Sequence, residues 1–149
     1  KRDWSSDVCS SDLTMVKLNS EMKNAFSKMR LFPLATASKD GVPNVIPIGF
    51  CKLQDDDETV WIADNFFLKT LDNLKENPRV ALYVWGPETQ GCFQIKGPIE
   101  IKTSGEDYEK MYRMVKSMGD RFPARSLVVM KISEVYECVS GPDAGKKLL

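Results

Sequence analysis

A lysine and a threonine follow a short polar turn at a point where a strand is expected to give way to a helix. Asp64 and Asn65 make the turn, and Lys69 and Thr70 fall in the first turn of a helix predicted over residues 67–76. The first turn of a helix has unpaired N–H groups and a partial positive charge. An ammonium and a hydroxyl beside those N–H groups would complete a phosphate site, so the sequence favours a nucleotide- or cofactor-binding domain. The alternative is an ordinary solvated helix face.

The composition argues against most other kinds of site. Histidine is absent from the 149 residues, which excludes histidine bases and Ser-His or Cys-His nucleophile pairs. The 21 basic and 21 acidic residues balance, which argues against a nucleic-acid-binding module, and no apolar run approaches the ~20 residues of a membrane span. Redox chemistry would therefore need a bound organic cofactor.

The cysteines are widely spaced, without a C-x-x-C pair, so zinc or iron–sulfur ligation is not expected. Single cysteines within apolar runs are typical of buried thiols in a reduced, cytoplasmic protein. The acidic run over residues 54–58 predicts a solvated turn rather than a metal site. The four cysteines are Cys9, Cys51, Cys92 and Cys138.

The N-terminal segment differs from the rest of the chain. Residues 1–13 are rich in Ser and Asp, have no helix or strand period, and lack the apolar core of a signal peptide. They resemble a translated sequencing adapter, so we expect residues 1–14 to be a non-native tail and the natural chain to start at Met15. The alternative is a short disordered native tail. One domain is expected over residues 15–140, followed by a surface extension over residues 141–149.

The remaining sequence predicts short strands and a few helices. The helix expected over residues 18–29 can be capped by Asn19 or Ser20, and Ser104 and Asp107 have the spacing of a capping box for a later helix. Hairpin-joined strands favour an antiparallel sheet, and a sheet of this size tends to close into a barrel. Strands are expected at 31–37, 42–50, 60–63, 79–85, 92–101 (bulged or interrupted at residues 97–98), 126–132 and 135–139.

An ordered set of motifs resembles a known family. A hairpin at residues 41–43 leads into a strand over residues 45–50, and a second strand covers residues 59–63. Lys69, Asn73-Leu74 and Asn77-Pro78-Arg79-Val80 follow, and then Gln94 to Gly97. Over roughly residues 15–139 this set resembles the pyridoxamine 5'-phosphate oxidase-like family of FMN-binding split β-barrels.

The resemblance implies a mainly β protein: a six-stranded antiparallel Greek-key split β-barrel with flanking helices, forming a homodimer with FMN at the interface. Lys69 and Thr70 would hold the FMN phosphate. Gln90 lies near the position of a glutamine in the oxidases, so the resemblance also suggests it as a cofactor-binding residue. The residues implied beside the ring or ribityl chain are Val45, Ile46, Pro47, Ile48, Gly49, Ile62, Ala63 and Asp64.

The residues themselves agree with a flat ligand at the first of these strands. Pro47 cannot donate to a sheet ladder and Gly49 has no side chain, so the strand is irregular and a ligand could approach its backbone. A bulge at a barrel corner is the compatible alternative. Trp61, Tyr83 and Trp85 are expected in the core or the dimer interface, with Tyr83 and Trp85 as the exposed candidates.

The expected function is that of an FMN-binding flavoprotein, an oxidoreductase or electron-transfer protein with unknown donor and acceptor. The alternatives are an F420-dependent reductase of the same fold and a non-enzymatic FMN-binding or sensing module. After Val139 the chain lacks the C-terminal Trp and Arg with which the oxidases hold the pyridoxal substrate, so true pyridoxamine phosphate oxidase activity is not expected. No side chain stands out as catalytic.

Overall fold

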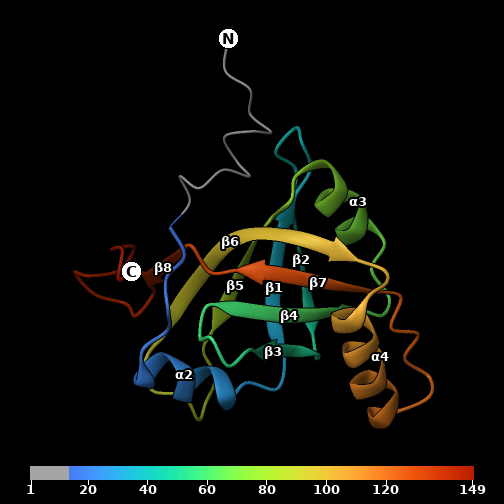
Figure 1. The fold of residues 1–149 in the computed structure, drawn as a ribbon. Helices are drawn as coiled ribbons and strands as arrows, with labels where there is room; N and C mark the ends of the chain where they lie inside the picture. Colours follow the sequence, from blue (N-terminus) through green and yellow to red (C-terminus); the bar gives the residue numbers. More distant parts are fainter. Residues whose placement is uncertain (1–13) are drawn as a thin grey trace.

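The computed structural model describes residues 14–149, so the expected tail over residues 1–14 lies almost wholly outside the described part. Figure 1 shows a curled sheet with α3 and α4 on one side and α2 below. The helices are α2 (Ser20–Ser27), α3 (Lys69–Glu76) and α4 (Glu106–Met118). The strands are β1 (Phe32–Ala37), β2 (Pro43–Ile48), β3 (Cys51–Leu53), β4 (Thr59–Asp64), β5 (Arg79–Val84), β6 (Phe93–Lys102), β7 (Ser126–Lys131) and β8 (Glu134–Glu137).

The sheet curls because its two ends belong to one segment of chain. Every pairing is antiparallel, in the order β2-β1-β5-β6-β7-β4-β3, with β8 added beside β6. Strand β2 pairs with β1 and β3 pairs with β4, while only Gly49 and Phe50 separate β2 from β3. The strand expected over residues 42–50 corresponds to β2 and ends at Ile48, and β3, which follows Phe50, was not expected. Eight strands therefore form within residues 14–149, where the sequence pattern predicts seven and the resemblance implies six. The predicted mainly β split barrel is confirmed.

Strand β6 joins the two halves of the curled sheet without interruption. Its residues 93–98 pair with β5, and residues 99–102 pair with β7. The expected break at Gly97-Pro98 is therefore a change of partner within one strand. A Cβ atom at Gly97 would lie 1.7 Å from the Lys131 carbonyl oxygen, so only glycine allows β7 to approach there.

Two hydrophobic clusters fill the molecule. The larger lies inside the barrel, where Leu34, Leu82 and Ile95 are fully buried. The smaller lies on the outer side of β4 and β7, where α4 packs Met111 and Val115 against them. Every residue of β4 is buried because the barrel interior covers one face of this strand and α4 covers the other.

The helix starts differ in how far the sequence predicted them. Asn19 caps α2 as expected, since its side chain accepts a hydrogen bond from the Met22 N–H at 2.9 Å. The capping box predicted at Ser104 is wrong: the N-cap of α4 is Gly105, with φ 98° and no side-chain hydrogen bond. Gly105 adopts a left-handed backbone that lets the chain turn without a cap.

The C-terminal residues fold back along β8. Tyr136 forms an isolated bridge with Lys147, and the Leu148 N–H donates to the Val135 carbonyl at 2.7 Å. Leu149 packs against the barrel core, so the segment covers the outer edge of β8. Among the helices of residues 14–149, none is long and apolar enough to cross a membrane.

Candidate functional site

A cavity of about 470 Å³, here called the apolar cavity, opens between β2, the segment after β4, and α4. Its lining contains one charged residue, Arg30, and one side-chain amide, Asn65. The other lining residues are apolar or glycine: Ile46, Pro47, Ile48, Gly49, Phe50, Ala63, Phe66, Phe67, Val115, Met118 and Phe122. Such a lining suits the flat apolar body of a ligand, with few polar groups to orient it.

Strand β2 presents an edge without a partner strand at this place, because within residues 14–149 it pairs with β1 alone. The Ser38 N–H donates to the Val42 carbonyl at 3.0 Å, which fixes the alternation of hydrogen-bonded pairs along β1 and β2. By that alternation the backbone groups of Val45 and Pro47 point away from β1. Proline at position 47 costs the ladder nothing there, since its missing N–H would have faced outward.

The first turn of α3 is held against the same strand. The Asn44 side-chain amide donates to the Thr70 hydroxyl oxygen at 3.1 Å, and the Asn73 amide donates to the Thr36 hydroxyl oxygen at 3.0 Å. The N-cap residue Leu68 makes no side-chain cap hydrogen bond, and Lys69 is exposed beside it. The first N–H groups of α3 therefore have no capping side chain and lie next to a lysine.

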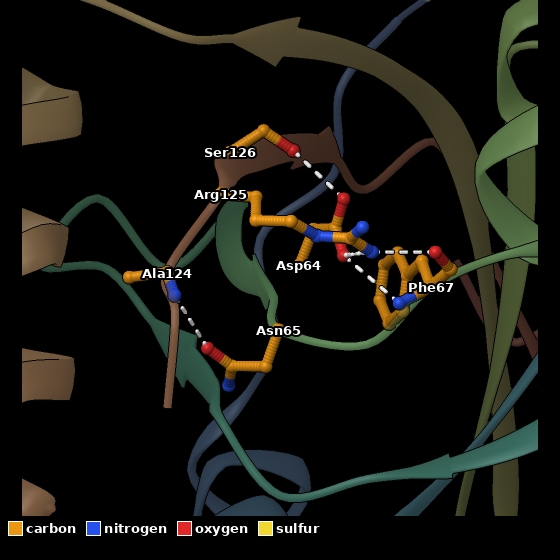
Figure 2. Close-up of polar contacts among 6 residues, drawn as sticks. All are labelled: Asp64, Asn65, Phe67, Ala124, Arg125 and Ser126. Carbon is orange, nitrogen blue, oxygen red and sulfur yellow. Dashed lines mark hydrogen bonds and ion pairs between the residues drawn. The ribbon is translucent and has the colours of Figure 1, made fainter. Parts of the chain in front are cut away.

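A buried network, here called the Asp64 cluster, fixes the loop between β4 and α3 (Figure 2). Its members are Asp64, Asn65, Phe67, Ala124, Arg125 and Ser126. The Asp64 side chain is 1% exposed, and its carboxylate accepts hydrogen bonds from the Arg125 guanidinium at 2.9 Å and the Phe67 N–H at 3.0 Å. The Ser126 hydroxyl donates to its second oxygen at 3.3 Å. Both carboxylate oxygens of Asp64 therefore accept hydrogen bonds from other residues of the cluster.

The same cluster ties the loop to the segment before β7. Arg125 also donates to the Phe67 carbonyl at 2.5 Å, and the Ala124 N–H donates to the Asn65 side-chain oxygen at 2.9 Å. Ala124 has φ 46°, a strained value for a residue with a Cβ atom, and the Tyr108 hydroxyl further holds it by donating to its carbonyl at 2.9 Å. These bonds fix the residues on either side of Phe66 at the wall of the apolar cavity.

The structure brings together only some of the residues predicted for the site. Ile46, Pro47, Ile48, Gly49 and Ala63 line the apolar cavity. Lys69 and Thr70 lie at the start of α3, outside this lining but only a few residues after Phe66.

The other predicted residues lie elsewhere. Val45 faces outward on β2 and is 65% exposed, while Ile62 is fully buried inside the barrel. Asp64 is enclosed in its cluster, and Gln90 is exposed in the loop between β5 and β6.

Several cavity residues were not predicted from the sequence. Val115 and Met118 belong to the apolar stripe of α4, which has the spacing of ordinary helix packing; Val115 is buried, but Met118 is 58% exposed. Phe66 is 68% exposed, and its ring lies 6.5 Å from that of Phe122. No sequence pattern predicted Arg30 or Arg125 as site residues. The fold places Arg30 beside the apolar cavity and Arg125 beside Asp64, which lies far from it in the sequence.

Comparison with known proteins agrees with this geometry. A family model described as pyridoxamine 5'-phosphate oxidase matches residues 18–138. The chain is 41% identical over 138 residues to an uncharacterized protein of Methanocaldococcus jannaschii, with 89% of each chain covered.

Three solved structures share the fold at lower identity. HupZ of Group A Streptococcus superposes with a TM-score of 0.72 at 24% identity, covering 86% of this chain and 99% of that one. An FMN-binding protein of Syntrophomonas wolfei gives 0.65 at 18% identity, with 78% and 82% covered. An F420 reductase gives 0.62 at 19% identity, with 79% and 98% covered. These likenesses show the fold, and the family match over residues 18–138 shows that the chain belongs to the pyridoxamine 5'-phosphate oxidase family.

Proposed function

We propose that this protein binds flavin mononucleotide, with the ring in the apolar cavity and the phosphate at the first turn of α3. The supporting observation is that two surfaces beside β2 suit the two parts of FMN. The uncapped N–H groups of α3 and Lys69 suit the phosphate, and the apolar cavity at Ile46 to Phe50 suits the ring. Family membership and the FMN-binding protein of Syntrophomonas wolfei point the same way.

The residues present fit such a cofactor. Lys69, the Thr70 hydroxyl and the N–H groups of the first turn would hold the phosphate. The outward backbone groups of Val45 and Pro47 are available for polar atoms of the ring. A Cβ atom at Gly49 would meet only Leu31, at 3.9 Å, so the glycine leaves open space beside the strand.

The flavin, when bound, supplies electron or hydride transfer. The part of the chain is to bind, orient and shield the cofactor. The Asp64 cluster fixes the loop that contains Phe66 and Phe67, while Val115 and Met118 of α4 close the opposite wall. The activity that we propose is that of a cytoplasmic oxidoreductase.

A titration of the protein with FMN tests the proposal, and the quenching of flavin fluorescence measures the binding. Lys69→Ala should weaken binding by about 1.5–3 kcal/mol, or roughly tenfold to a hundredfold, since a charge-assisted hydrogen bond is lost. Thr70→Ala should have a smaller effect because a neutral hydroxyl makes a weaker bond. Lys75→Ala in the last turn of α3 is the matched control. Equal affinity in the Lys69 and Lys75 variants would place the phosphate elsewhere.

We further propose a homodimer whose second subunit covers the flavin. The outer face of β2, β1 and β5 has small or apolar side chains in register: Val45 lies beside Ala35, and Ala35 lies beside Ala81. Tyr83 and Trp85 extend this face and are 37% and 52% exposed. Self-complementary patches of this kind suit a two-fold dimer.

Light scattering at micromolar concentration tests the dimer. Ala35→Glu should give monomers with weakened FMN binding, because a charge would be placed at the centre of the proposed contact. Lys52→Glu on the exposed side of β3 is the control and should stay dimeric. A wild-type monomer that binds FMN tightly would contradict the idea that the site needs two chains.

A second candidate is deazaflavin F420, favoured by the likeness to the F420 reductase. Mass spectrometry of the ligand released from purified protein distinguishes the two cofactors.

A third candidate is a protein that binds FMN without catalysis. Among residues 14–149, Arg30 is the only charged residue that lines the apolar cavity. Turnover with NAD(P)H and an artificial electron acceptor separates an enzyme from a binding module.

A further inference from the structure

Two cysteines on neighbouring strands face each other directly. Phe93 of β6 is paired with Glu137 of β8, so the next pair along the ladder is Cys92 with Cys138. The Cys138 N–H donates to the Cys92 carbonyl at 2.8 Å, which confirms that the two residues are opposite each other. Both are free thiols. Opposed residues of a sheet have their side chains on the same face, so the two sulfur atoms are neighbours.

The spacing of this pair suits a covalent bond. Opposed residues in a hydrogen-bonded antiparallel pair have Cα atoms about 5.5 Å apart. Disulfides span Cα separations of roughly 4.4–6.8 Å, so the backbone need not move far to accommodate one.

In a single subunit the pair is also accessible to a small reagent, whereas in the dimer proposed above the contact at Tyr83 and Trp85 would slow its entry. A cavity of about 330 Å³ is lined by both cysteines together with Tyr83, Trp85 and Val139. The Cys92 thiol donates a hydrogen bond to the Tyr83 hydroxyl at 3.0 Å. Cys92 is buried, whereas Cys138 is partly exposed, so a reagent would reach Cys138 first.

We propose that Cys92 and Cys138 are a reversible oxidation site that exchanges with a low-molecular-weight disulfide. The Cys138 thiolate attacks one sulfur of the reagent, forming a mixed disulfide and releasing one thiol. The Cys92 thiolate then attacks the Cys138 sulfur, closes the intramolecular disulfide and releases the second thiol. The two protein thiols are oxidised, the reagent disulfide is reduced to two thiols, and the two protein protons pass to those thiols.

The surroundings determine how fast the exchange runs and what it changes. Burial, and then the neighbouring Cys92 thiol, raise the pKa of Cys138, so exchange is slow at neutral pH and accelerates as the pH rises. The bond would join β6 to β8 across a long sequence interval. Because the C-terminal residues pair with β8, oxidation would also fix that segment to the barrel.

Glutathione disulfide at mildly alkaline pH is the probe. It should be added to the reduced full-length chain carrying Cys9→Ser, since Cys9 lies outside the described residues. The expected product lacks two hydrogens by intact mass, contains a peptide pair linking Cys92 to Cys138, and melts at a higher temperature until reductant is added. At a fixed ratio of glutathione to its disulfide, the linked fraction should be at least about tenfold higher than in the urea-denatured chain, since the fold holds the thiols at bonding distance.

Matched variants separate this pair from the third described thiol. Cys51→Ala should still form the link, because Cys51 is buried and its pKa is raised by that burial. Cys92→Ser should stop at a glutathione adduct on Cys138. Persistent glutathione adducts on the wild-type pair, or a link that involves Cys51, would overturn the proposal. The peptide map of the wild-type chain does not depend on whether either variant folds.

Discussion

Two aspartates stand at opposite ends of β4 and organise the chain in different ways. Asp56 shapes the turn that enters the strand, and Asp64 shapes the loop that leaves it. The Asp56 carboxylate accepts hydrogen bonds from the Glu58 and Thr59 N–H groups at 3.0 and 2.9 Å and from the Thr59 hydroxyl at 2.6 Å. All of these partners lie within three residues, and Asp56 is exposed.

Asp64 combines one local partner with two distant ones. Phe67 is three residues away, whereas Arg125 and Ser126 are more than sixty residues away in the sequence. The buried Asp64 carboxylate links two loops, while the hydrogen bonds of Asp56 stay within its own turn. Through Asp64, the loop beside the proposed cofactor is therefore joined to a segment far along the chain, which Asp56 does not do for its own turn.

The comparison predicts unequal losses of stability when each carboxylate is removed. Asp64→Ala should lower the free energy of unfolding by about 3 kcal/mol, at the low end for a broken buried pair because the Arg125 guanidinium is half exposed. The Phe67 N–H would also lose its acceptor. Asp56→Ala should cost about 1 kcal/mol, as for an exposed cap. Urea unfolding measures both, and equal losses would contradict the distinction.

The same contrast explains what the sequence could predict. The turn at residues 54–58, the Asn19 cap and the antiparallel split barrel follow from local signals or from an ordered set of motifs. The Asp64 cluster depends on Arg125 and Ala124, which the fold brings to the loop from the far end of the chain. The end of β2 at Ile48 and the separate strand β3 likewise reflect the closure of the barrel, which no local pattern specifies.

A second prediction tests whether Arg125 supports the loop through Asp64 and Phe67. Arg125→Met should keep the aliphatic packing but leave the buried Asp64 carboxylate without its counter-charge and lose the bond to the Phe67 carbonyl, lowering the free energy of unfolding by about 3 kcal/mol. The control is Arg121→Met. Arg121 lies 4.5 Å from the ring centroid of Phe122, a contact worth about 0.5–1 kcal/mol. If both arginines gave the smaller loss, the Asp64 cluster would not be what fixes the loop.

The smallest expected effect concerns the pH dependence of the turn at Asp56. Partial burial raises the pKa of Asp56, but hydrogen bonds from the Thr59 hydroxyl and the Glu58 and Thr59 N–H groups, with the charge of Lys131, outweigh it and lower the pKa overall. A carboxyl with a lowered folded-state pKa contributes stability above its unfolded-state pKa of about 3.9, and this contribution disappears as the pH falls through the folded-state pKa.

Asp56→Asn cannot titrate, so the difference in free energy of unfolding between wild type and variant should be constant near neutral pH and shrink below about pH 4. Urea unfolding of both proteins between pH 7 and pH 2 measures it. A difference that stays constant or grows in acid would mean that the turn gains nothing from the charge.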